Sequence, residues 1–261
     1  MLKFKLLLGL SVLFSVAFAQ SPFDQYKNLF NPPLSYVVNY SATAPVIDGD
    51  INDEAWQKAA WTSYFQDIEG DLKPKPYYQT RAKMLWDDNF LYIAAELKDP
   101  HVWGNLTKRD EIVFFDNDFE IFLDPYNTTH AYFEIEINAL NNIFDLFLTK
   151  PYRNGGQPLF SWDTQGMKHA VKINGTLNNP NDTDEGWTVE FAIPFRAVSL
   201  SNHINVPKDK DVWRINFSRV QWETEVKNGK YVKRKDANGK DLAENNWVWS
   251  PQGVIDMHRP E

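Results

Sequence analysis

The residues best suited to chemistry lie at alternate positions along the segment HAYFEIEINAL (130–140). Glu134 and Glu136 alternate there with Phe133 and Ile135, and successive side chains of a β-strand point to opposite faces of the sheet. One face of this segment would therefore join a core, while the other presents two carboxylates. A face of that kind is either a hydrated sheet surface or the floor of a polar ligand groove.

Two further segments carry the same kind of side chain. DNDFEIFLDP (116–125) places Glu120 on an acidic face, and DVWRINFSRVQW (211–222) alternates until Arg219 and Val220, where the pattern breaks. A β-bulge at that point would turn Arg219 toward the acids. If these strands are neighbours, then carboxylates, amides and a guanidinium gather on one surface, a combination that suits the donor and acceptor needs of sugar hydroxyls.

Ten tryptophans accompany these polar groups. Core packing is expected for five of them, because each buries a large area: Trp56, Trp61, Trp86, Trp187 and Trp213. The other five fall at strand ends or among polar residues, where a ring can stay partly exposed and stack on a sugar: Trp103, Trp162, Trp222, Trp247 and Trp249. In ENNWVWSPQG (244–253), Trp247 and Trp249 share one side, and Asn245 adds a hydrogen-bonding amide.

These residues must be positioned by strands, because the chain shows few signals for helices. The helix signals are 52–59 and a turn at 195–199. Candidate strands, rich in aromatic and β-branched residues, cover 35–41, 61–66, 78–87, 90–98, 117–124, 130–139, 143–149, 166–174, 186–193 and 211–222. Many short strands separated by turns predict an all-β fold, an antiparallel two-sheet β-sandwich that is immunoglobulin-like or jelly-roll-like.

The domain organisation follows from composition. Residues 20–34 hold three prolines and no clear period, so they are expected to form an extended lead-in. Residues 35–261 are expected to form a single sandwich domain. The polar, charged and glycine-containing stretch 223–245 is expected to be a long mobile loop.

Four motifs in one order give the chain a family resemblance: PVIDGDINDEAWQKA, AKMLWDDNFLYIAAELKDP, DNDFEIFLDP and GWTVEFAIPF. In order and spacing they resemble carbohydrate-binding module family 9, over most of residues 44–252. WRINFSRVQW and WVWSPQGVIDMHRPE are similar to its stand-alone secreted branch, the family 9-like proteins. The resemblance implies a β-sandwich in which Asp48 and Gly49 form a turn that admits Trp56 to the core.

The resemblance also implies a site that holds a terminal sugar between two aromatic plates. By motif, Glu120 matches a family carboxylate, Trp247 matches one plate, and Phe114 lies near the position of the other. The sequence departs from the family at Phe114, where better-studied modules have tryptophan, and at Glu136, where they have arginine. An identical sugar pocket is therefore not expected.

We accordingly predict a non-catalytic, exported protein that binds an oligo- or polysaccharide, with glycoside hydrolases or other saccharide-handling proteins as further partners. The predicted ligand-binding residues are Phe114, Glu120, Glu136, Arg219, Asn245, Trp247 and Trp249. Two alternatives stay open. One is a haem- or redox-binding sandwich that uses Met84, Met257 or His258, and the other is a surface-assembly module without a small ligand.

Metal and catalytic sites are weaker predictions. The resemblance permits structural calcium, and DGDIND (48–53) and NPNDTDE (179–185) offer clustered oxygen ligands. Turn formation explains both stretches better, because Asp and Asn are common in turns. Glu120, Glu134 and Glu136 could form a glycosidase pair, but on an exposed sheet face nothing would raise the pKa of one carboxyl. The protein is therefore expected not to be an enzyme.

The start of the chain predicts export. Residues 1–19 combine Lys3 and Lys5 with an apolar run and small residues at Ala17 and Ala19, which is typical of a secretory signal cleaved before Gln20. The expected location is secreted or periplasmic, without membrane insertion after cleavage. Cysteine is absent, which excludes disulfides and thiolate chemistry. Dispersed basic residues in a chain with a net charge of −8 argue against binding to nucleic acid.

Overall fold

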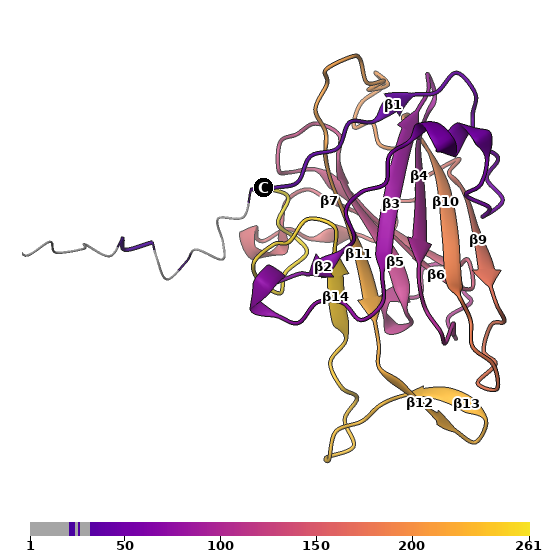
Figure 1. Ribbon diagram of the computed structural model, residues 1–261. Coiled ribbons are helices and arrows are strands. Elements are labelled where there is room, and N and C mark those ends of the chain that lie inside the picture. The colour runs from indigo at the N-terminus through magenta and orange to yellow at the C-terminus, as the bar shows by residue number, and fades with distance from the viewer. Residues whose placement is uncertain (1–20, 24–25, 27–31) are drawn as a thin grey trace, which may run out of the picture.

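Two β-sheets stacked face to face form the body of the protein in the computed structural model (Figure 1). The structure describes residues 21–23, 26 and 32–261, so the predicted signal segment 1–19 lies outside the described residues. The small sheet has five strands, in the order β1 (Asn39–Tyr40), β3 (Thr80–Trp86), β4 (Phe90–Leu97), β10 (Gly186–Pro194) and β9 (Lys168–Asn174).

The large sheet has seven strands and carries the polar residues singled out above. Its order is β2 (Gln66–Asp67), β14 (Asn245–Val248), β11 (Arg214–Gln221), β5 (Asp118–Asp124), β6 (Tyr132–Asn138), β7 (Ile143–Leu148) and β8 (Pro158–Leu159). All strand pairs are antiparallel except β1 with β3. The predicted antiparallel β-sandwich is thereby confirmed.

Helical structure in the described part of the chain is limited to single turns of 3-10 helix. These are η2 (Glu54–Lys58), η3 (Gly70–Leu72), η4 (Val113–Phe115) and η5 (Tyr152–Asn154). The helix predicted for 52–59 is thus η2, and the turn predicted at 195–199 is present. None of the helices described is long and apolar enough to cross a membrane.

The strand predictions differ from the structure in several segments. The expected strands 35–41 and 61–66 pair with a sheet only at β1 and β2, two residues each. The expected loop 223–245 contains instead a hairpin of β12 (Thr224–Lys227) and β13 (Lys230–Lys233), which extends beyond the sandwich (Figure 1). Asn228 and Gly229, both with positive φ, form its two-residue turn, and such Asn-Gly turns favour tight hairpins.

The core lies between the two sheets and follows from the alternation of side chains. Phe119, Ile121, Phe133 and Ile135 from the large sheet are buried against apolar residues of the small sheet such as Phe191. Alternate residues on both sheets therefore face inward, as the sequence pattern predicted.

A second apolar cluster lies on the other face of the small sheet and surrounds Trp56, which is fully buried. The Trp56 Nε1–H donates to Glu190 Oε1 at 2.6 Å, while Glu190 Oε2 accepts from the backbone N–H groups of Gly49 at 2.7 Å and Asp48 at 3.1 Å. Gly49 has φ +89°, and a Cβ there would lie 2.7 Å from Lys172 N. The Asp48-Gly49 turn and Trp56 thus form one structural unit, as the family resemblance implied, on the outside of the small sheet.

Candidate functional site

The outer face of the large sheet carries acidic side chains at facing positions of β5 and β6. Glu120 pairs with Glu136 across the two strands, and Glu120 also lies opposite Ser218 of β11. Glu134 lies two residues before Glu136, on the same face of β6. The alternation of polar and apolar residues in the two motifs therefore predicted correctly that these carboxylates share one surface.

This surface is covered, and the cover leaves a cavity of about 460 Å³ over β5, β6, β7 and β11. Phe114 of η4 and residues 255–258 near the end of the chain form parts of its wall. The described lining residues are Ile68, Ile112, Phe114, Glu120, Phe122, Glu134, Glu136, Phe144, Leu146, Tyr152, Phe160, Val220, Glu244, Asn246, Ile255, Asp256, Met257 and His258. We call this space the outer-face cavity.

Burial changes the acid–base behaviour of the carboxyls in the outer-face cavity. Desolvation raises the pKa of Glu120 to about 7 and that of Glu134 to about 8. The pKa of Glu136 lies well above its usual range because of desolvation and the charges of Glu120 and Glu134. The expectation that these acids lie on an exposed face with ordinary pKa values is therefore wrong, because neighbouring segments exclude water from them.

The histidine nearest to these acids is neutral at physiological pH. Burial lowers the pKa of His258 to about 4, and its Nδ1 lies 2.9 Å from the Tyr132 hydroxyl. Its Nε2 lies 4.0 Å from Glu134 Oε2. Since the pKa of Glu134 is raised while that of His258 is lowered, this contact joins two groups that both favour their uncharged forms.

Three of the seven predicted site residues line the outer-face cavity: Phe114, Glu120 and Glu136. The Phe114 backbone N–H donates to Glu136 Oε2 at 3.1 Å, which connects η4 to β6. The ring of Phe114 is half-buried and packs beside Phe115, which is 49% exposed. The pairing of β5 with β6 brings Glu120 and Glu136 together, and the hydrogen bond from η4 adds Phe114.

Arg219 was placed on the wrong face by the sequence analysis. The pairing of β11 runs without interruption from Arg214 to Gln221, so no bulge occurs and Arg219 shares the inner face with Phe217. Its guanidinium is fully buried, lies 3.1 Å from Asp99 Oδ2, and donates to Thr80 Oγ1 and to the Lys98 carbonyl. Arg219 therefore joins the two sheets and does not reach the acids of the outer face.

Trp247 and Trp249 were also predicted wrongly, as exposed plates for a sugar. They are 2% and 3% exposed and belong to the core between the sheets. Trp247 pairs with Arg219 in register and its ring lies 5.4 Å from the guanidinium carbon. Because the two tryptophans share the inner side of the segment, their neighbour Asn246 faces outward and lines the outer-face cavity instead.

Asn245 lies outside the outer-face cavity. Its Nδ2 donates to the Gln221 carbonyl at 3.1 Å and to the Tyr77 hydroxyl at 3.3 Å. This places it near a second cavity, of about 430 Å³, at one end of the sandwich. The second cavity is lined by Tyr77, Tyr78, Asp99, His101, Gln221, Trp222, Glu223, Thr224 and Arg234.

The aromatic rings available to a ligand are phenylalanine and tyrosine rather than tryptophan. Phe160 is 56% exposed and Tyr152 is 41% exposed, and both line the outer-face cavity. The ring centroid of Phe160 lies 5.8 Å from that of Phe144 on its floor. Sequence reasoning missed these rings because Phe160 and Tyr152 lie in turns with no strand pattern, while all ten tryptophans are buried or half-buried.

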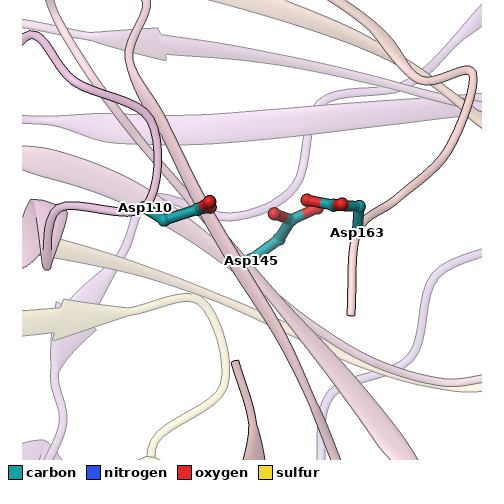
Figure 2. A group of neighbouring side chains, drawn as sticks. All are labelled: Asp110, Asp145 and Asp163. Atoms are coloured by element: carbon teal, nitrogen blue, oxygen red, sulfur yellow. The ribbon is translucent and has the colours of Figure 1, made fainter. Parts of the chain in front are cut away.

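A different acidic group lies beside β7, where Asp110, Asp145 and Asp163 point toward one another from separate segments (Figure 2). Here the positive charge is supplied by the chain, because Arg109 Nη2 lies 2.6 Å from Asp145 Oδ1 and 2.9 Å from Asp163 Oδ1. This group is therefore an ion-pair network at the edge of the sandwich.

The acids of the two stretches considered for calcium accept hydrogen bonds from the backbone. Asp48 and Asp50 in 48–53 accept hydrogen bonds from backbone N–H groups two residues ahead, and Asp50 also pairs with Lys172 at 2.8 Å. In 179–185, Asp184 accepts from the backbone N–H groups of Val102 and Thr176. These oxygens therefore stabilise turns and loop contacts, which is the alternative that the sequence favoured.

The residues considered for haem do not share a site. Met84 is buried between the two sheets, whereas Met257 and His258 line the outer-face cavity on the opposite side of the large sheet. Met84 therefore cannot act together with Met257 or His258, and a haem held by Met257 or His258 alone stays a prediction.

A two-sheet sandwich with a ring-lined, oxygen-rich cavity on one sheet is typical of a carbohydrate-binding module. The chain belongs to the family described as "Carbohydrate family 9 binding domain-like", whose model matches residues 47–247. This confirms the resemblance found in the four sequence motifs. The match covers most of the chain, so the family assignment applies to the sandwich as a whole.

Curated relatives match the chain over part of its length. The chain is 30% identical over 159 residues to Exoglucanase XynX of Acetivibrio thermocellus, and 30% identical over 155 residues to Endo-1,4-beta-xylanase C of Paenibacillus barcinonensis. These matches cover 60% and 59% of the chain but 12% of each relative. The similarity thus concerns a small portion of each enzyme.

A solved structure supports the same fold. It is a putative carbohydrate-binding protein from Bacteroides uniformis, with a TM-score of 0.60 and 14% sequence identity. The similarity covers 86% of this chain and 93% of that one. The sandwich architecture is therefore shared over nearly all of both chains.

Proposed function

We propose that this chain is a non-catalytic saccharide-binding protein that holds its ligand in the outer-face cavity. The observation that carries the proposal is the combination of exposed rings, Phe160 and Tyr152, with oxygen-bearing groups on a single floor. A ring can stack on the apolar C–H face of a pyranose, while carboxyls and the Asn246 amide exchange hydrogen bonds with its hydroxyls. The volume of about 460 Å³ is in the range of small-molecule sites.

The raised pKa values supply both kinds of hydrogen-bonding group. A protonated carboxyl donates as well as accepts, so Glu134, whose pKa is raised to about 8, can serve a sugar hydroxyl in either sense near neutral pH. Glu136 lies beside Glu120 on the same floor. A glycosidase needs two carboxyls that flank the scissile bond, so this arrangement favours binding over hydrolysis.

The names of the curated relatives suggest the ligands to try. We propose that the saccharide belongs to the β-glucan or xylan type, since one relative is an exoglucanase and another a xylanase. Separate glycoside hydrolases are the partners that would act on the same polysaccharide.

Titration calorimetry with cello- and xylo-oligosaccharides tests the proposal. We expect saturable binding to at least one series, and we expect Phe160→Ala to weaken it at least tenfold, since the exposed ring contributes contact area without supporting the core. Tyr40→Ala is the matched control, because Tyr40 is 50% exposed on β1 of the small sheet. Absence of heat with every oligosaccharide, or equal weakening by both variants, would contradict the proposal. Release of reducing ends on long incubation would contradict its non-catalytic part.

We further propose that the chain is exported. The support is the charged, apolar and small-residue pattern of residues 1–19. Expression in a bacterium followed by cell fractionation should yield a periplasmic or secreted protein whose first residue is Gln20. A cytoplasmic protein that still begins with Met1 would contradict export.

A further inference from the structure

The floor of the outer-face cavity holds a concentration of carboxylates without a matching positive charge. One oxygen from each of Asp118, Glu120 and Glu136 lies within 4.8 Å of the others, and all three side chains are buried. No lysine or arginine is found among the described residues that line the cavity. Within the described part of the chain, these three acids form no ion pair with a basic side chain.

Some of the oxygens at this place also have no hydrogen-bond partner. Asp118 is completely buried, and while its Oδ1 accepts from the Val220 backbone N–H at 3.1 Å, its Oδ2 has no hydrogen-bond partner in the described structure. Glu134 is 5% exposed and lines the cavity, and its Oε2 is likewise without one. Leaving buried acceptors unsatisfied is costly, so these two oxygens call for a proton, a water molecule or a cation.

The other acidic group of the molecule shows what the chain does when it balances such charges itself. Asp145 and Asp163 contact the guanidinium of Arg109 at 2.6 and 2.9 Å (Figure 2 shows the acids). The group on β5 and β6 has a more deeply buried set of acids and no equivalent of Arg109. Three charges of the same sign in close contact and out of water need a cation or protons.

We infer that Asp118, Glu120 and Glu136 bind one divalent cation of the calcium type at the floor of the saccharide cavity. The three grouped ligands are carboxylate oxygens, the hard type that calcium prefers, whereas zinc favours nitrogen and sulfur ligands. Calcium accepts carboxylates in one- or two-oxygen mode at about 2.3–2.6 Å, so two of its ligands lie at most about 5 Å apart. The separation of 4.8 Å or less fits that limit.

The position of the ion relates it to the proposed function. Glu120 and Glu136 line the cavity, whereas Asp118 does not, so the ion would have protein on one side and the ligand space on the other. Sugar hydroxyls are hard oxygen ligands and can complete its coordination. This part of the inference rests on the proposed saccharide binding, but the binding of the metal by itself does not.

The test is titration calorimetry of chelator-treated, full mature protein with CaCl₂, and in parallel with MgCl₂ and MnCl₂. We expect one Ca²⁺ per chain and an increase in melting temperature on binding, since a ligand that binds only the folded state stabilises it. Glu120→Gln should weaken Ca²⁺ binding at least tenfold, because it removes a charged ligand while preserving shape. Asp163→Asn, in the group balanced by Arg109, is the matched control and should bind Ca²⁺ as the wild type does.

Several results would overturn the inference. These are no heat with any of the three ions, equal affinity in Glu120→Gln, or equal loss in Asp163→Asn. Asp118→Asn provides a second variant in case Glu120→Gln fails to fold. Binding of glucosamine without binding of any metal ion would also overturn it, since the positive charge would then come from the sugar.

Saccharide titrations distinguish this failure from that of the proposed function. If oligosaccharides bind equally well to chelator-treated and Ca²⁺-loaded protein while Ca²⁺ gives no heat, then the metal site is wrong and the saccharide site stands. If Ca²⁺ binds but no saccharide does, then the metal site stands and the proposed function fails.

Discussion

At the scale of single residues, the side that a strand residue faces decides its role. Glu120 and Glu136 face outward and line a cavity, whereas Arg219 and Trp247 face inward and pack in the core. All four belong to motifs that the sequence associated with one sugar site. Alternation within each strand was readable, but the choice of Arg219 depended on a bulge that the register of β11 does not contain.

The buried Arg219 gives a prediction that separates a structural role from a ligand-binding one. Arg219→Met leaves Asp99 buried without its ion-pair partner, so we expect the free energy of unfolding to fall by about 3–5 kcal/mol. Chemical denaturation monitored by tryptophan fluorescence would measure this. Arg234→Met removes an exposed pair with Glu223 and should cost about 1 kcal/mol or less. A stable Arg219→Met protein that had lost saccharide affinity would support the original placement of this residue.

At the scale of elements, side-chain hydrogen bonds attach irregular segments to the sheets. The segment 46–58 has little regular structure beyond η2, yet Trp56 and the Asp48-Gly49 turn both bind Glu190 of β10. The hairpin β12–β13 was also hard to predict, because its charged strands resemble a loop in composition. The positions of the long strands along the chain were predictable from apolar alternation, whereas the short elements were not.

Trp56→Phe tests the attachment of the segment 46–58. The change keeps most of the apolar contact but leaves the buried Glu190 Oε1 without its indole donor, so we expect a loss of about 1–3 kcal/mol in stability. Trp86→Phe, at a half-buried ring, should cost about 1 kcal/mol or less. Thermal unfolding of the two variants beside the wild type would compare them. An equally mild effect of both substitutions would show that the hydrogen bond to Glu190 is not important for stability.

At the scale of the whole molecule, the segment that follows β14 closes the outer face of the large sheet. His258 contacts the Tyr132 hydroxyl and the Tyr152 ring, and Arg153 donates to the His258 carbonyl and to Glu261. These contacts convert a sheet surface into a cavity with buried acids. Burial of the carboxyls is therefore a property of the assembled molecule and not of β5 or β6 alone.

The titration of His258 links this packing to global stability. Its pKa is lowered to about 4 by burial, so between that pH and about 6.5 the unfolded chain binds a proton that the folded chain does not. Proton binding by His258 in the unfolded chain therefore lowers the free energy of unfolding as the pH falls from 6.5 toward 4, by about 3 kcal/mol. Above pH 6.5 this loss is absent. The difference in unfolding free energy between wild type and His258→Gln, measured from pH 4 to 7.5, should show this slope. A pH-independent difference would contradict the burial of a neutral imidazole.

The sequence by itself determined the sandwich, the family and the grouping of Glu120 with Glu136, because a two-residue period in an antiparallel sheet fixes which side chains share a face. It also indicated that Trp56 is structural. Only the tertiary structure decided that Trp247 and Arg219 lie inside, that Phe160 and Tyr152 supply the exposed rings, and that the acids are buried. The physical reason is that alternation does not state which face of a strand is inner, nor which distant segments exclude water from the outer face. The inner face of a strand and the cover over its outer face depend on register across strands and on contacts between residues more than 100 positions apart, such as Tyr132 with His258.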